Sequence, residues 1–359
     1  DDAAQEELGR MDISRGVELA RTSLRANGLI VLLIALHMAG AAMLSRIYGF
    51  GVRFSFLGQL AFPASTYAVA GAALILWRLR TLPANPLQDL VRDVRSWNLG
   101  ERIAVAAPAV LAFSFFGSSF GAIKSAIPQM HPYTWDATFA AWDVAIHGQD
   151  AWRVIQPLVG HPLISSALTG VYHFWLLAFN LGLVIACAAS PASILRKQFL
   201  IAFILSWTLI GNLAATLLAS VGPCFVQPML GDPRYDGLMA YLRTAAEQYP
   251  ILTLDVQQML LDDARRGAAG LGRGISAMPS MHVSISLLLA LALRRLRPSW
   301  QWAGWLFLAV IMVGSVHLGY HYAVDGYISL VLTLLVWKLS GMMAGYRPQP
   351  AVGYRLALD

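Results

Sequence analysis

The sequence predicts an all-α integral membrane protein with about eight transmembrane helices. Of its 359 residues, 57% are hydrophobic and only 13% are charged, whereas soluble domains have about 25% charged residues. The mean hydropathy is +0.57. Apolar runs of about 20 residues, the length needed to cross a bilayer, recur along most of the chain. One membrane domain can therefore account for the whole length.

Each predicted span is an apolar run between polar or charged loops. The fourth run is long enough to tilt in the bilayer, and the sixth is short. Residues 1–25 are polar and lack the apolar core of a signal peptide, so we expect an amphipathic lead-in segment there. The eight runs are residues 26–45, 56–77, 103–123, 162–189, 198–221, 275–293, 301–320 and 324–341.

These runs divide the chain into four parts. Residues 1–25 form the N-terminal segment, and residues 26–100 form two accessory helices with a basic loop. Residues 101–341 form a six-helix membrane core, and residues 342–359 form a tail. Cys187 and Cys224 fall near opposite membrane faces in this arrangement, so no disulfide is expected.

The distribution of basic residues predicts how the helices are oriented. Of the 26 Lys and Arg residues, 17 lie in the N-terminal segment, in loops 78–102, 190–197 and 294–300, and from residue 338 onward. Loops rich in Lys and Arg stay on the cytoplasmic side of a membrane. Both termini are therefore predicted to be cytoplasmic. The net charge of +6 reflects these loops, and no nucleic-acid partner is expected.

A long loop on the opposite side, residues 124–161, combines aromatic and acidic residues. Tryptophan is typical of the depth of lipid headgroups, so the loop predicts short helices lying in the membrane interface. An ordinary surface loop and a wall that admits lipid are both compatible with this pattern. The residues concerned are Trp135, Asp136, Trp142, Asp143, Asp150 and Trp152.

Two motifs on that same predicted side carry the residues best suited to chemistry. The first is Ser-Ala-Met-Pro-Ser-Met-His at 276–282, and the second spans 315–325 and contains His321 and Asp325. Pro and Ser in the first motif predict a helix start, where free N–H groups and the helix dipole favour an anion. In the second motif the four-residue spacing places His321 and Asp325 on one helical face. An aspartate there can orient a nucleophilic or acid–base histidine.

Together these motifs resemble the type 2 phosphatidic acid phosphatase superfamily, and most closely its inositol-phosphorylceramide synthase-like branch. The chain departs from the phosphatase members at Val316, where they have Arg, and at Met281, where they have Gly. Their upstream Lys-x6-Arg-Pro element is not found in that form. The resemblance implies that the last six spans form a lipid phosphatase or phosphotransferase core.

The resemblance also implies roles for individual residues. His321 would be the nucleophile that forms a phosphohistidine, with Asp325 orienting it and His282 as acid and base. Arg273, three residues before the first motif, is the leading candidate for binding phosphate, because the arginine usual at Val316 is missing. The other candidate substrate-binding residues are Ser280, His317 and Tyr322.

These observations predict a lipid phosphotransferase that moves a phosphate or phospho-headgroup through a phosphohistidine at the outer membrane face. Its partners would be lipids in the bilayer, a homo-oligomer is compatible with the sequence, and no cofactor or metal is implied. Two alternatives stay open: a lipid-phosphate phosphatase, and a lipid transporter with a histidine relay. His317, His321 and Asp325 could also form a 2-His-1-carboxylate metal site, although the first motif would then have no role.

Overall fold

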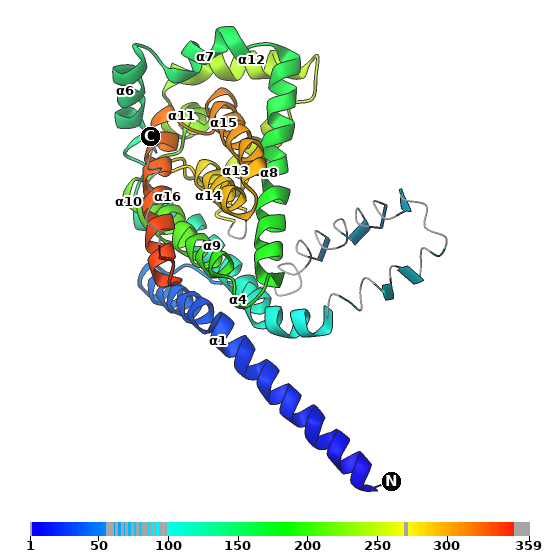
Figure 1. The fold of residues 1–359 in the computed structure, drawn as a ribbon. Helices are drawn as coiled ribbons and strands as arrows, with labels where there is room; N and C mark the ends of the chain where they lie inside the picture. Colours follow the sequence, from blue (N-terminus) through cyan, green and yellow to red (C-terminus); the bar gives the residue numbers. More distant parts are fainter. Residues whose placement is uncertain are drawn as a thin grey trace, which may run out of the picture.

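The computed structural model describes residues 2–54, 99–268 and 272–347, and scattered positions between 61 and 96. Within these residues the chain forms helices and no strands, which confirms the all-α fold class (Figure 1). The predicted span at 56–77 falls largely outside the described residues. Among those residues, six segments are long and apolar enough to cross a membrane: Gly16–Tyr48, Arg102–Ser125, Pro162–Ala188, Ile194–Leu217, Pro298–His317 and Ala323–Met343.

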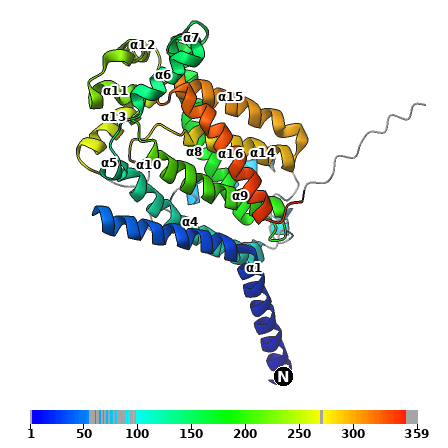
Figure 2. The same cartoon turned by 90° about the vertical axis from the view of Figure 1, so that its left-hand side faces the viewer.

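A bundle of long helices forms the body of the molecule. The N-terminal segment and the first predicted span form one continuous helix, α1, whose first part extends beyond the bundle (Figures 1 and 2). The bundle helices are α1 (Asp2–Tyr48), α4 (Leu99–Ser125), α8 (Pro162–Ala188), α9 (Ile194–Leu205), the π-helix η1 (Ser206–Ala214), α10 (Ala215–Leu217), α14 (Met281–Leu296), η3 (Pro298–Trp300), α15 (Gln301–His317) and α16 (Ala323–Met343).

The short helix α14 lies inside this bundle, against α8, α9, α15 and α16. Its 16 residues correspond to about 24 Å of helix. Small residues let its neighbours approach closely: a Cβ atom added to Gly304 of α15 would lie 2.7 Å from the Cα atom of Ala290. The first motif therefore begins a buried helix that is enclosed by longer ones.

The helix that begins as α9 changes to π-helical geometry in η1. Gly211 of η1 packs against α4 and α14, where an added Cβ atom would lie 2.9 Å from the ring of Phe120 and 3.0 Å from the sulfur of Met281. π-Helical segments occur frequently at functional sites. Here the segment brings three helices together beside the start of α14.

Shorter helices cover the end of the bundle where α14 and α16 begin, which we call the motif end. Figures 1 and 2 show α6, α7 and α12 together there, away from the free start of α1. The predicted interfacial helices of loop 124–161 thus exist as helices. The set comprises α5 (Ile127–Met130), α6 (Asp136–His147), α7 (Ala151–Val159), α11 (Pro223–Leu230), η2 (Pro233–Tyr235), α12 (Asp236–Ala246) and α13 (Leu252–Arg265).

Polar contacts attach α1 to the other helices at the end of the bundle opposite the motif end, which we call the far end. The amide nitrogen of Asn27 donates a hydrogen bond to the carbonyl of Val105 in α4 at 2.7 Å. The buried guanidinium of Arg196 donates to the side-chain oxygen of Asn27 at 2.6 Å. This accessory helix is therefore joined to both α4 and α9.

Candidate active site

The second motif forms a tight turn between two bundle helices. α15 ends at His317, and α16 begins at Ala323. Gly319 adopts φ +77° in this turn, a conformation that favours glycine. His321 lies in the turn and Asp325 in the first turn of α16, so the prediction that both share one helical face is wrong. The helix starts too late to include His321.

His321 and Asp325 nevertheless contact each other directly. The Nδ1 atom of His321 lies 3.2 Å from the Oδ2 atom of Asp325, which also accepts a hydrogen bond from the N–H of Tyr322 at 3.1 Å. When Nδ1 donates to Asp325, Nε2 carries the lone pair that can attack an electrophile. The His321 ring also makes a hydrogen bond with the backbone of Ala277 in the first motif. Burial, reinforced by the charge of Lys124, lowers the pKa of His321 to about 3, so its imidazole is neutral.

The first motif leads into α14 as the sequence predicts. Ser280 is the N-cap residue, and its hydroxyl accepts a hydrogen bond from the N–H of Val283 at 3.3 Å. Pro279 lies one residue before this cap, and His282 lies in the first helical turn. The Ser280 hydroxyl is buried and engaged with the helix, which leaves His282 as the reactive side chain of this motif.

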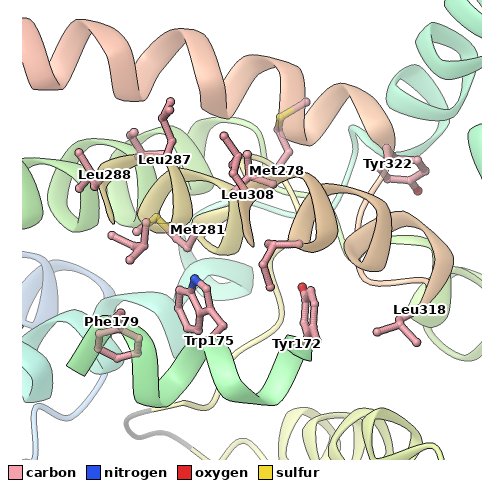
Figure 3. Packing of buried hydrophobic residues seen from close by; sticks show 14 of the residues in the cluster. Tyr172, Trp175, Phe179, Met278, Met281, Leu287, Leu288, Leu308, Leu318 and Tyr322 are labelled. Carbon is pink, nitrogen blue, oxygen red and sulfur yellow. The ribbon is translucent and has the colours of Figure 1, made fainter. Parts of the chain in front are cut away.

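Aromatic side chains of α8 enclose His282. The rings of Tyr172 and Trp175 each have their centroids 4.1 Å from the centroid of His282. The indole N–H of Trp175 donates to the backbone carbonyl of His282 at 3.1 Å. Figure 3 shows both aromatic side chains projecting from α8 toward α14. The His282 and His321 centroids are 6.1 Å apart, so the two motifs face one site.

A segment at residues 220–224, which we call the joint loop, connects the two motifs. The carbonyl of Ser220 accepts a hydrogen bond from the N–H of Ala277 at 3.0 Å. The N–H of Cys224 donates to the carbonyl of Gly319 at 2.8 Å. Gly222, at φ +88°, leaves no room for a side chain, because an added Cβ atom would lie 2.9 Å from the Cβ of Ala277. The joint loop thus fixes the distance between the motifs.

Asp136 of α6 holds the joint loop against the second motif. Its carboxylate accepts hydrogen bonds from the N–H groups of Val221 and Gly222, both at 2.9 Å, and from the hydroxyl of Tyr322 at 2.8 Å. Burial raises the pKa of Asp136, while these three donors oppose that rise. The hydroxyl of Tyr322, a predicted substrate-binding residue, is therefore already engaged in a hydrogen bond within the protein.

Asp143, two turns further along α6, caps α16. It accepts hydrogen bonds from the N–H groups of Ala323 and Val324, both at 3.0 Å. A carboxylate at a helix N-terminus also interacts favourably with the helix dipole. Asp150 follows at the same spacing and pairs with Arg234 at 2.7 Å. All three aspartates of the predicted interfacial loop thus have structural partners.

Lys124, at the end of α4, is the cation whose charge reaches both histidines. Its position has a signal in the sequence: Lys124 precedes His131-Pro132 at the spacing of the Lys-x6-Arg-Pro element, with His in place of Arg. Arg273, the predicted phosphate-binding residue, instead pairs with Asp263 at 3.1 Å and is 44% exposed. The structure thus adds a second candidate cation.

His317 lies away from the pair formed by His321 and Asp325. Its buried Nε2 atom lies 2.8 Å from the hydroxyl of Ser165, which also contacts the hydroxyl of Tyr241 at 2.8 Å. His317 therefore belongs to a polar contact between α8, α12 and α15. No group of three His, Cys, Asp or Glu residues in the described part of the chain could hold a metal ion.

The fold and this site describe a multi-pass membrane protein with a carboxylate-oriented histidine that faces a second histidine, and with a partly buried lysine whose charge acts on both. Comparison with protein families identifies the group to which it belongs. The model of the PAP2 superfamily matches residues 137–339, more than half of the chain, and the chain therefore belongs to this superfamily. The match includes both motifs, the joint loop and α6 apart from its first residue, Asp136. Searches of curated proteins and of solved structures found no significant match.

Proposed function

We propose that this protein is a lipid phosphotransferase that moves a phosphorylated headgroup from one lipid to another through a phosphohistidine on His321. Superfamily membership supports a phosphatase or phosphotransferase acting on lipids. The observation that carries the proposal is the contact of His321 with Asp325, directly facing His282. A neutral histidine oriented by a carboxylate can act as a nucleophile, and a second histidine can move the proton.

The proposed reaction has two steps. The Nε2 atom of His321 attacks phosphorus while the bond from phosphorus to the donor lipid's oxygen breaks, and His282, which enters this step in its protonated form, gives that oxygen its proton. In the second step the hydroxyl of an acceptor lipid attacks the phosphohistidine, His282 takes the hydroxyl proton, and His321 is released. Lys124 stabilises the charge on the phosphoryl oxygens throughout.

Two features support transfer to a lipid alcohol over hydrolysis. His321, which would carry the phosphohistidine, is only 6% exposed, and this burial limits the access of water to it. The site also has few cations: Val316 replaces the arginine usual in phosphatases, and Arg273 pairs with Asp263. A phosphodiester carries less charge than a phosphomonoester, so it needs fewer compensating cations.

The test is to offer the purified protein in detergent a panel of lipid phosphomonoesters and phosphodiesters together with ceramide or diacylglycerol as acceptors. Both free phosphate and newly formed lipids are measured. We expect new phosphodiester lipids, with some hydrolysis, and inhibition by vanadate. Steady release of phosphate from a monoester without turnover of any diester would instead identify a phosphatase. Turnover that vanadate does not inhibit would contradict the proposed phosphohistidine intermediate. Movement of lipid across the membrane without any new or hydrolysed lipid would favour a transporter.

We further propose that the motif end faces away from the cytoplasm, as the distribution of Lys and Arg predicts. Single cysteines at Gln248, beside α12, and at Ser299, at the far end, test this in a chain whose two native cysteines are replaced by alanine. Both positions are exposed. A membrane-impermeant thiol reagent added to intact cells should label position 248 and not position 299. The opposite pattern would reverse the topology.

A further inference from the structure

The phenol of Tyr172 is a polar group in the site that has no role so far. Tyr172 is 5% exposed, and its ring lies between His282, at 4.1 Å, and Tyr320, at 5.2 Å between centroids. Its hydroxyl oxygen is buried and has no hydrogen-bond partner within the described residues. Burying a hydroxyl without a partner lowers the stability of the folded protein. The folded protein therefore bears this cost beside its reactive histidine.

The position of this hydroxyl suits it to bind substrate. Tyr172 stacks on His282, whose ring faces that of His321, so the phenol lies beside the pair of histidines. Its ring stacks nearly parallel to His282, at 19°, an arrangement in which the faces of the two rings meet. Figure 3 shows the hydroxyl pointing away from α8. A donor with these properties is free to bind a substrate atom placed between the two histidines.

We propose that the Tyr172 hydroxyl donates a hydrogen bond to a non-bridging oxygen of the phosphoryl group that His321 transfers. This role rests on the proposed function and deepens it, because it assigns a neutral donor to a site with few cations. A phenol carries no charge at neutral pH. It can therefore bind a phosphoryl oxygen without adding the positive charge that a phosphomonoester would need.

The test compares Tyr172→Phe with Tyr235→Phe. Tyr235 is a matched control, because its hydroxyl is also buried without a hydrogen-bond partner in the described part of the chain, but it packs against Tyr322 outside the pair of histidines. Neither change removes a hydrogen bond of the resting protein, so both should leave the thermal midpoint unchanged or slightly raised. Only Tyr172→Phe should lower kcat, by about 10- to 100-fold, as the loss of one hydrogen bond to a charged group predicts.

Vanadate resembles the phosphoryl group in the transition state of its transfer. Its binding therefore gives a readout that does not depend on turnover. We expect Tyr172→Phe to weaken vanadate binding about tenfold, as the loss of one hydrogen bond to a charged group predicts, and Tyr235→Phe to leave it unchanged. Equal vanadate affinity in both variants would overturn the proposal. So would a wild-type protein that binds no vanadate, or a Tyr172→Phe variant whose activity and thermal midpoint fall together.

These outcomes are separable from failure of the proposed function. A wild-type protein that binds vanadate but converts no lipid of the panel would contradict phosphotransfer between lipids. The vanadate affinities of the two tyrosine variants would still decide whether Tyr172 contacts a phosphoryl group.

Discussion

The two histidines of this site are held in different ways. His321 lies in a turn whose position is set by hydrogen bonds: Asp325 binds its ring, and Asp143 binds the helix start that follows. His282 lies in the first turn of a buried helix, and flat rings of Tyr172 and Trp175 enclose it. Within the described residues, no hydrogen bond orients the ring nitrogens of His282.

This difference matches the different tasks that we propose for the two side chains. A nucleophile has to present one nitrogen in one direction, and a carboxylate on the other nitrogen provides that. A group that first gives and then takes a proton has to change its charge, and it must reach two oxygens in turn. Aromatic faces restrict the plane of the ring and leave both nitrogens free of fixed partners.

The largest effect is expected at the nucleophile. His321→Ala removes the atom that we propose attacks phosphorus, so turnover should fall by about 10³-fold or more. The measurement is formation of product lipid at matched expression, together with trapping of a phosphorylated histidine by acid quench. A variant that keeps more than about a tenth of the wild-type rate would show that His321 is not the nucleophile.

His282→Ala should also lose nearly all turnover of natural lipids, but its loss should depend on the leaving group. A donor whose leaving group is nitrophenolate needs no protonation, so it should form the phosphohistidine at a substantial rate in this variant. His321→Ala should form no phosphorylated protein with the same donor. Rapid-quench measurement of the phosphorylated protein distinguishes these cases. If His282→Ala lowers the rate equally with natural lipids and with the nitrophenyl donor, His282 does not act as the acid that protonates the leaving group.

Asp325→Asn should lower kcat by on the order of 100-fold, because an amide can hold the wrong tautomer of His321. Asp255→Asn is a suitable control, since Asp255 is exposed on α13. The readout is kcat and the extent of phosphohistidine labelling, with thermal midpoints to confirm folding. An Asp325→Asn variant with normal kcat would mean that hydrogen bonds do not hold the nucleophile in the way described.

A smaller effect should separate the two candidate cations. Lys124→Ala should lower kcat/KM by about 30- to 100-fold, because it removes the charge that acts on both histidines. Arg273→Ala should cost about tenfold, and Arg273→Lys less, since lysine keeps the charge but not the planar fork. If Arg273→Ala proves more damaging than Lys124→Ala, Arg273 must leave Asp263 to bind substrate.

The sequence predicted the helical fold, most spans and the convergence of His282, His321 and Asp325. These predictions rest on local patterns, since apolar runs and short motifs are read from neighbouring residues. Lys124 was missed because its element has His131 where arginine is usual. The span at 56–77 stays a prediction, and so do the roles of His282, His321, Asp325 and Arg273.

The remaining features depend on contacts that are distant in sequence. Asp136 and Asp143 looked like polar positions in an interfacial loop, because nothing near them in the sequence identifies backbone N–H groups as their partners. Tyr172 and Trp175 enclose His282 only because α8 is rotated so that this face meets α14. Helix rotation follows from packing within the whole bundle, which a single sequence does not specify.

The long reach of α6 has a consequence for biosynthesis. Asp143 binds N–H groups that lie 180 residues later in the chain, and Asp136 binds a hydroxyl 186 residues later. While the ribosome is still synthesising the chain, both carboxylates are already made but their partners are not. His321, the proposed nucleophile, is also synthesised after both carboxylates and after most of the membrane helices. A truncated chain would therefore insert most of its helices without gaining a site able to react with the lipids around it.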